Sequence, residues 1–335
     1  MILRSAAPLA LMLALAACGG NSLNNVAPGT DGGTDGGIDS DRELPPGTES
    51  PTRNSDIVRY EAEDGAGSGY VTSVSYDRAT DTFTVDNLAF DGDNAYRRGV
   101  AVGSLGPYAV YESDSAYIDS QTGAPIEQYT HRALYGVSRT GETEFAIVRT
   151  GSYVGYGFGG FIYERNGSVT LPTEGQASFT GDYAALRDFQ GRGGLEYVTG
   201  DMAMAIDFDD FNSGAAVRGE ITNRAIFDLN GRDITAEVLA ALSEDTNVTQ
   251  SVLPTVVFQV GPGTLDANGE MAGLADSAVP TDTGTREAYE SGNFYAVVSG
   301  DGAQEVTGII VLTADDPRFD GVTVRETGGF ILYRE

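Results

Sequence analysis

The sequence contains no lysine and no tryptophan, and it has one cysteine, Cys18, and one histidine, His131. A single cysteine excludes a disulfide bond within the chain, and the two residues together are too few for a cysteine–histidine zinc site. Without lysine the chain can form neither a Schiff base nor the lysine contact of a phosphate-binding loop. The 49 acidic residues outnumber the 20 basic ones, which gives a formal net charge of -29. Nucleic acid is therefore not an expected partner, because binding phosphate needs a basic surface.

Glycine and the aromatic residues are abundant, with 45 Gly, 17 Tyr and 14 Phe among 335 residues. From Ile57 onward, short segments rich in Val, Tyr, Phe and Thr alternate with clusters of Gly, Asp and Asn, which is typical of β-strands joined by turns. The pattern predicts an all-β fold with one short helix, Ile234–Ser243, whose apolar residues recur at intervals of four. We expect Asp276–Arg286 to be a mobile loop.

The first residues have the pattern of a bacterial lipoprotein signal. Arg4 precedes the apolar run Leu9–Leu15, which is too short to span a bilayer and is typical of a signal peptide over Met1–Ala17. The segment ends in Leu-Ala-Ala-Cys at Cys18, which resembles a lipobox; an ordinary signal with a chance cysteine is the alternative. We expect Cys18 to carry palmitate-type acyl chains, and Gly19 after it permits the outer membrane. Each buried methylene contributes about 0.8 kcal/mol to anchoring.

Residues 18–56 have the composition of a flexible, lipid-anchored linker. The stretch 19–56 holds eight glycines, four prolines and no aromatic residue, so it cannot bury enough apolar surface to offset the entropy of ordering. Its acidic run could bind calcium, but the acids are mostly four apart, whereas a calcium loop has them two apart, which favours a solvated linker. The expected organisation is a signal peptide at 1–17, this disordered tether, a β-rich region at 57–165 and a second at 166–335.

Residues 166–335 resemble the barrel domain of transferrin-binding protein B and related surface lipoproteins. That domain opens with Leu-Pro and Gly-x-Ala-x-aromatic-x-Gly, continues with Asp-Phe and then apolar-x-Gly-x-apolar, and ends with a Gly-x-Phe-Tyr-Gly strand. The matching residues are Leu171-Pro172, Gly175 to Gly181, Asp207-Phe208, Val217 to Ile221 and Gly292-Asn293-Phe294-Tyr295. The sequence departs from the family at Ala296, where glycine is usual.

The resemblance implies an eight-stranded antiparallel β-barrel filled by side chains, preceded by a β-rich handle that residues 57–165 would supply by position. It also implies a lipid-anchored protein that captures a partner through exposed loops. In the family, the anchored protein hands an iron-carrying host protein to an outer-membrane transporter. The transferrin binders have two handle-plus-barrel lobes and this chain has room for one, so transferrin itself is in doubt. No ligand contact carries over, because the contacts lie on variable loops.

Candidate ligand contacts come from composition. Tyr153, Tyr156 and Phe158 form an aromatic cluster among glycines, which is either a stacking surface for a ligand or a packed junction between handle and barrel. Arg98 and Arg286 are cations in a strongly acidic chain, where they either pair with carboxylates of a partner or neutralise acid nearby. We expect binding to depend on handle loops and on the loops at one end of the barrel.

His131 lies in a predicted strand, where a structural residue, a haem ligand and a general base are the alternatives. No acid and nucleophile stand beside it in the sequence. Asp207, Asp209 and Asp210 could form a glycosidase-type carboxylate pair, but acidic residues are common enough here to be neighbours by chance. We therefore expect no catalytic residue, no metal and no cofactor, and a protein that is not an enzyme.

Two functions remain. The first is a surface lipoprotein that binds a macromolecular ligand or a haem-type or iron-carrier ligand for nutrient uptake, together with a TonB-dependent outer-membrane receptor. The second is a structural or adhesive envelope lipoprotein without a transport role. In both, the bilayer is a partner through acylated Cys18. The protein is then anchored in the outer membrane and faces either the cell surface or the periplasm.

Overall fold

The computed structural model describes residues 43–64, 67–86, 88, 95–113, 120–123, 131–151, 155–208, 217–260 and 264–335. This part of the chain consists of β-strands and one helix, α1 (Thr235–Thr246), so the predicted all-β class is confirmed. The helix covers the predicted segment Ile234–Ser243 almost completely and continues to Thr246. Among the described residues, no helix has the length and apolar character needed to cross a membrane.

The first part of the chain forms one antiparallel sheet, which we call the handle sheet. Its strands are β1 (Ile57–Tyr60), β2 (Val74–Asp77), β3 (Thr82–Val85), β4 (Ala95–Arg98), β5 (Ser104–Leu105), β6 (Tyr108–Ser113), β7 (His131–Val137), β8 (Thr143–Thr150) and β9 (Gly159–Arg165). Their spatial order is β1-β9-β8-β7-β6-β4-β3-β2, and β5 pairs with β6. Strand β3 alternates half-buried threonines with buried Phe83 and Val85, because successive side chains of a strand point to opposite faces.

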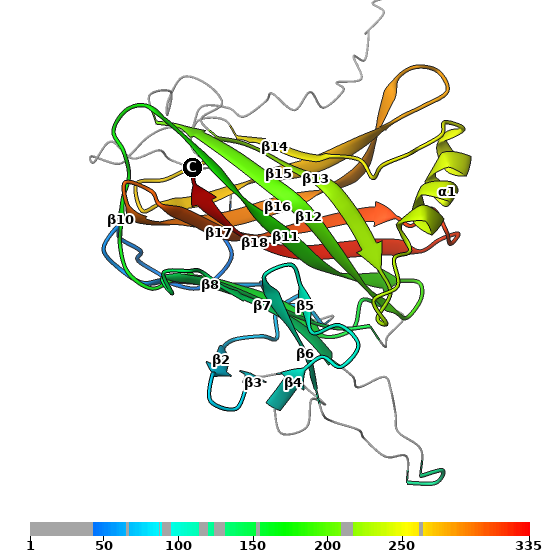
Figure 1. Ribbon diagram of the computed structural model, residues 1–335, viewed down its shortest axis with the longest axis horizontal. Helices are drawn as coiled ribbons and strands as arrows, with labels where there is room; N and C mark the ends of the chain where they lie inside the picture. The colour runs from blue at the N-terminus through cyan, green and yellow to red at the C-terminus, as the bar shows by residue number, and fades with distance from the viewer. Residues whose placement is uncertain are drawn as a thin grey trace, which may run out of the picture.

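The second part of the chain forms a closed barrel. Its strands are β10 (Val169–Thr170), β11 (Gln176–Gln190), β12 (Leu195–Asp207), β13 (Val217–Phe227), β14 (Val256–Val260), β15 (Glu270–Pro280), β16 (Arg286–Asp301), β17 (Glu305–Asp315) and β18 (Thr323–Arg334). Strands β11 to β18 pair antiparallel in chain order, and β11 also pairs with β18, which closes the barrel (Figure 1). The predicted eight-stranded barrel is thereby confirmed. Strand β10 joins the end of β16 in parallel.

Apolar side chains fill the middle of the barrel. The rings of Phe258 and Phe294 lie 4.4 Å apart between centroids in this core, together with buried residues from the other strands. Burial of such a side chain contributes roughly 1.5–3 kcal/mol. Gly219 lies against Phe258, and a Cβ atom there would overlap the ring. The glycine of this motif is therefore needed for core packing.

One face of the handle sheet packs on the outer wall of the barrel. Phe145 of β8 lies against Gly329 of β18 within an apolar cluster that both parts share. The Tyr108 hydroxyl donates to the carbonyl oxygen of Asp182 at 2.7 Å and accepts from the amide of Ile331 at 2.8 Å. Burial raises the pKa of Tyr108 well above its usual range, so this hydroxyl keeps its proton. The opposite face of the handle sheet has its own buried cluster, which includes Phe83, Tyr96, Tyr111 and Tyr135.

Buried arginines also join the two sheets. Arg149 of β8 is fully buried and donates to Thr327 Oγ1 of β18 at 2.9 Å. Arg165 of β9 donates to two carbonyl oxygens of the barrel region, at 2.7 and 3.0 Å. Arg59 of β1 pairs with Glu270 of β15 at 2.6 Å. These contacts hold the handle sheet against the barrel at several points.

The predicted flexible linker is shorter than 18–56. The amide of Thr48 donates to the carbonyl oxygen of Val58 at 3.0 Å, and the carbonyl oxygen of Arg53 accepts from the amide of Val169 at 2.8 Å. Residues 43–56 are therefore bound to folded strands through backbone hydrogen bonds, which composition does not reveal. The signal peptide, Cys18 and the linker up to residue 42 lie outside the described residues, and their roles stay predictions.

The prediction of a mobile loop at Asp276–Arg286 is wrong for most of the segment. Strand β15 continues to Pro280 and β16 begins at Arg286, so the turn occupies only residues 281–285. The backbone pairs of a long hairpin hold this segment, including Val279 with Glu287. Cross-strand pairing therefore overrides the turn-rich composition.

Candidate functional site

Four connections of the barrel emerge at one end, which we call the α1 end. Because the strands are antiparallel, the connections β11–β12, β13–β14, β15–β16 and β17–β18 all lie at the same end. The β13–β14 connection carries α1, whose Val238 is buried in the barrel core, as is Ile234 just before it. Helix α1 and the β15–β16 hairpin both project at this end (Figure 1).

A cluster of paired charges fills the interior of the barrel at the α1 end. Arg224 donates to both carboxylate oxygens of Glu290, at 2.8 and 2.5 Å, and to Glu326 at 3.3 Å. Tyr183 and Ser277 donate their hydroxyls to the same two carboxylates. Burial alone would raise the pKa of Glu290, but the charge of Arg224 and its hydrogen bonds hold that pKa below its usual range. The Glu290 carboxylate is therefore ionised and neutralised in place.

A second group of charges lies closer to the rim. Arg318 pairs with Glu196 at 2.8 Å and with Asp316 at 2.6 Å, and Glu196 also accepts from Arg187 at 2.9 Å. Apolar side chains and paired charges thus occupy the inside of the barrel, so the surface of the rim is the part available to a ligand.

An arginine held by aromatic rings stands on this rim. Arg192 lies in the β11–β12 turn, and its guanidinium carbon is 4.0 Å from the ring centroid of Phe319 and 4.7 Å from that of Phe189. Its Nε donates to the carbonyl oxygen of Gly193 at 3.1 Å. Phe319, in the β17–β18 connection, is exposed. These two connections therefore present a cation and an aromatic ring side by side.

Two handle loops reach the barrel at the α1 end. The amide of Tyr156 donates to the carbonyl oxygen of Phe189 at 2.9 Å, and its ring lies 4.5 Å from the guanidinium carbon of Arg325. The loop at 99–103 contacts the β13–α1 connection, where Val102 lies close to Gly231. The rim is therefore built from both parts of the chain.

The structure places the predicted aromatic residues at this junction. Tyr156 has a φ of 45°, an uncommon backbone conformation for a residue other than glycine. Phe158 packs edge-on against Tyr70, with ring centroids 5.8 Å apart. Both side chains are half-buried in intramolecular packing. Tyr153 lies outside the described residues, and ligand contact by any of the three stays a prediction.

The two predicted arginines are engaged within the chain. Arg98 pairs with Asp81 at 2.8 Å and donates to the carbonyl oxygen of Gly103 at 3.2 Å, so it fixes the loop at 99–103. Arg286 donates to the carbonyl oxygen of Ala278 at 2.7 Å within the β15–β16 hairpin. The structure does not bring Arg98 and Arg286 together, and their contact with a ligand remains untested.

His131 is buried in the handle sheet. Its ring centroid is 6.3 Å from that of Tyr96, and its backbone amide donates to Ser113 Oγ at 3.0 Å. In the described part of the chain, no group of three or more His, Cys, Asp or Glu side chains has the arrangement of a metal site.

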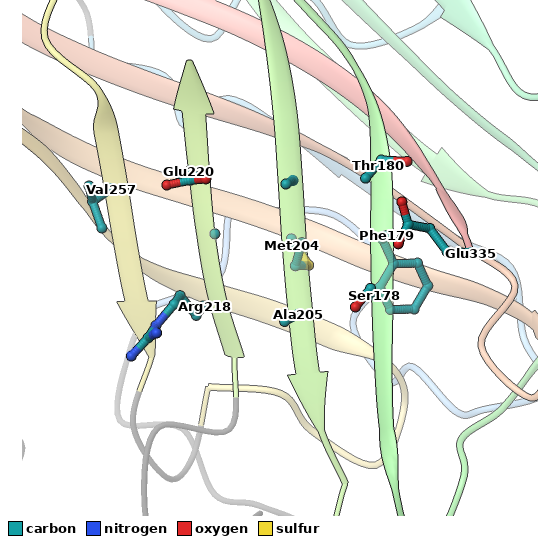
Figure 2. A pocket seen from close by; sticks show the side chains of 11 residues that line it. Ser178, Phe179, Thr180, Met204, Ala205, Arg218, Glu220, Val257 and Glu335 are labelled. Carbon is teal, nitrogen blue, oxygen red and sulfur yellow. The ribbon is translucent and has the colours of Figure 1, made fainter.

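A shallow depression of about 400 Å³ lies on the barrel wall over β11 to β14. Figure 2 shows its floor, where the small side chain of Ala205 stands between longer ones on the neighbouring strands. Arg218 and Glu220 border it on β13, and both are exposed. The depression is open to solvent, and its lining mixes polar and apolar side chains.

A carboxylate pair in the handle sheet responds to pH. Glu144 of β8 and Glu164 of β9 stand directly opposite each other, and the Tyr135 hydroxyl donates to Glu144 at 2.7 Å. Burial, with the negative charge of Glu164, raises the pKa of Glu144 to about 7. The folded pair therefore binds more protons between pH 4.5 and 7 than the unfolded chain does, so stability falls as the pH rises through this window.

We expect the free energy of unfolding of the Glu144→Gln variant, relative to the wild type, to increase by about 1–2 kcal/mol between pH 5 and pH 8. The amide carries no charge and keeps a hydrogen-bond acceptor for Tyr135. Urea unfolding of both proteins at the two pH values measures the difference. A difference that is the same at pH 5 and pH 8 would contradict the assignment.

Comparison with known proteins gives similarity of fold. No family model matches the sequence, and no curated protein matches it. Among solved structures, two mutants of transferrin-binding protein B from Haemophilus parasuis Hp5 are each 13% identical, with TM-scores of 0.35 and 0.36 over 76% and 79% of this chain. This chain spans 41% and 45% of their lengths. A structure described as a surface lipoprotein is 12% identical, with a TM-score of 0.33 over 60% of this chain and 80% of that one.

Proposed function

We propose that this protein is a lipoprotein of the cell surface that binds a macromolecular ligand at the α1 end of its barrel and carries out no catalysis. The observation that supports this most is the set of exposed apolar side chains at that end. Val100 is 95% exposed in a handle loop, Val252 is 72% exposed after α1, and Phe319 is 39% exposed in the β17–β18 connection. Single exposed apolar residues are ordinary, and Val137, Val257 and Leu274 are exposed elsewhere. Three on the loops of one end of the barrel support a surface suited to a partner.

The architecture under these residues supports the same proposal. The paired charges of the barrel interior and the hydrogen bonds of Arg98 hold the loops in fixed positions. Loops held by a stable scaffold lose little conformational entropy on binding. A protein partner suits a rim of exposed loops, whereas a small molecule needs a concave pocket.

The ligand class and the setting belong to the proposal as well. We propose anchoring in the outer membrane through acylated Cys18 and a ligand that is a haem-carrying or iron-carrying protein, taken up with a TonB-dependent receptor. The signal motif and the resemblance of residues 166–335 support this. The alternative is an adhesive or structural role, in which the same surface binds another envelope component.

The double variant Val100→Asp/Val252→Asp tests the proposal. We expect it to lose at least tenfold in ligand capture by intact cells grown without iron, because burying each valine contributes about 1.5 kcal/mol and each new carboxylate must lose water. The matched control is Leu274→Asp, since Leu274 is 50% exposed on the barrel wall. Equal capture by the double variant and the wild type would contradict binding at the α1 end. Capture that is independent of iron would favour the adhesive role.

A further inference from the structure

We propose that Arg192 is the receptor for a carboxylate group of the ligand, with Phe319 as the apolar surface beside it. This inference depends on the proposed function only for the statement that the carboxylate belongs to a protein partner. The binding of a carboxylate by Arg192 is argued from the surroundings of that side chain.

The guanidinium of Arg192 is fixed by aromatic rings instead of by a carboxylate. It lies 4.0 Å from the ring centroid of Phe319 and 4.7 Å from that of Phe189, so its plane and position are set by cation–π contacts. Its Nε is used by the carbonyl oxygen of Gly193. In the described part of the chain, its two terminal nitrogens make no hydrogen bond or ion pair. They are the pair of donors that binds a carboxylate in a bidentate manner.

Other arginines near the rim differ from Arg192. Arg318, whose guanidinium carbon is 5.3 Å from the same Phe319 ring, pairs with Glu196 and Asp316. Arg232 pairs with Asp228 and Glu237. In a chain with 49 acidic and 20 basic residues, a guanidinium on the surface has many carboxylates from which to gain a partner. Because the position of Arg192 holds its guanidinium away from these carboxylates, its charge stays available to a ligand.

The loops that carry the pair start from paired backbone, because Gln190 at the end of β11 pairs with Thr323 at the start of β18. Gly191 has a φ of +101° and lies so close to the carbonyl oxygen of Gly321 that a side chain would be crowded there. Arg192 and Phe319 therefore keep their relative position before a ligand arrives. A preformed site loses less entropy on binding than one that must be ordered.

The chemistry favours a carboxylate over a phosphate. The net charge of -29 repels polyanions, which disfavours a phosphate-rich ligand. A carboxylate on an Asp or Glu side chain of a partner protein carries one charge and brings neighbouring apolar atoms to Phe319. Arginine and aromatic residues in such pairs commonly contribute much of the energy of a protein interface.

Chemical modification tests the receptor without the natural ligand. Phenylglyoxal modifies guanidinium groups, and peptide mapping gives its rate at each arginine; the absence of lysine removes competing side-chain amines. We expect 100 mM benzoate to slow modification of Arg192 at least twofold and neutral benzamide to leave it unchanged. Arg78 is the internal control, because it is exposed on the β2–β3 turn far along the handle sheet and has no ion pair in the described residues.

Three outcomes would overturn the inference: no protection of Arg192 by benzoate, equal protection by benzamide, or equal protection of Arg78. The Phe319→Ala variant should reduce the protection, because the ring no longer positions the guanidinium.

A second variant separates this inference from the proposed function. Arg192→Met should lower ligand capture at least fivefold. If Val100→Asp/Val252→Asp loses ligand capture and Arg192→Met keeps it, the proposed function is supported and the role of Arg192 as carboxylate receptor is contradicted. If benzoate protects Arg192 but neither variant changes ligand capture, carboxylate binding by Arg192 is supported and ligand binding at the α1 end is contradicted.

Discussion

Replacing Arg224 by methionine is expected to lower the free energy of unfolding by about 3–5 kcal/mol, a large part of the stability of an ordinary domain. The guanidinium is buried inside the barrel, where it neutralises Glu290 and Glu326. Methionine fills a similar volume but leaves the buried Glu290 carboxylate without its cation, and it leaves Glu326 with only Arg187, whose Nε lies 3.8 Å away. A buried charge that has lost its partner is costly, because the site solvates it poorly.

Urea unfolding measured by circular dichroism and tyrosine fluorescence quantifies this loss, since the chain has no tryptophan. The matched control is Arg232→Met, because Arg232 also pairs with two carboxylates but its side chain is 60% exposed. We expect the control to change the free energy of unfolding very little, because solvent screens an exposed ion pair. Adding Glu290→Gln and Glu326→Gln to Arg224→Met should restore at least half of the loss. A cost for Arg224→Met no greater than that of the control would refute the role of the cluster.

Replacing Arg149 by methionine is expected to lower the free energy of unfolding by about 3–5 kcal/mol, because it removes a buried cation where the two sheets meet. Arg149 is fully buried where the handle sheet meets the barrel, and it donates to Glu61 at 2.8 and 3.0 Å. Burial alone would raise the pKa of Glu61, and Arg149 is the main cause that lowers it below the usual range. The variant therefore leaves a buried carboxylate unpaired and also removes the hydrogen bond to Thr327 of β18.

Hydrogen exchange distinguishes this variant from the first. Arg149→Met should speed exchange mainly in β8 and β9 of the handle sheet, whereas Arg224→Met should speed it in the barrel strands. Arg98→Met serves as the handle control, because the Arg98–Asp81 pair is partly exposed and should contribute less than about 1 kcal/mol. Faster exchange that is equal in both sheets for Arg149→Met would mean that they unfold as one unit.

The sequence predicts the positions of the barrel strands better than it predicts their lengths. Segments rich in Val, Tyr, Phe and Thr predict strands at Tyr197–Phe208 and Val322–Tyr333, which the structure shows as β12 and β18. The same pattern predicts two strands at Ala216–Ile221 and Arg224–Phe227, but the structure has one strand there, β13, interrupted by a bulge opposite Thr199 to Asp201. A bulge breaks the two-residue period, so the pattern divides a continuous strand into two.

The handle sheet and the candidate site were harder to predict for physical reasons. Strand β4, which the sequence pattern missed, is only four residues long and contains two adjacent arginines. Arg192 and Phe319 are brought together by the closure of the barrel, since β11 pairs with β18 across it. Composition indicated Arg98 and Arg286 because they are cations, but the partners of a guanidinium depend on tertiary contacts. The one sequence signal for Arg192 is its position in a turn of three glycines, Gly191, Gly193 and Gly194.

Photo-crosslinking on intact cells tests the central claim most directly. A benzophenone amino acid placed at Val252, on the α1 end, is compared with the same residue placed at Leu274, on the barrel wall; both positions are exposed. The account predicts that cells grown without iron give a discrete crosslinked protein adduct from position 252 and none from position 274. The same adduct from both positions, or an adduct from position 274 alone, would contradict binding at the α1 end.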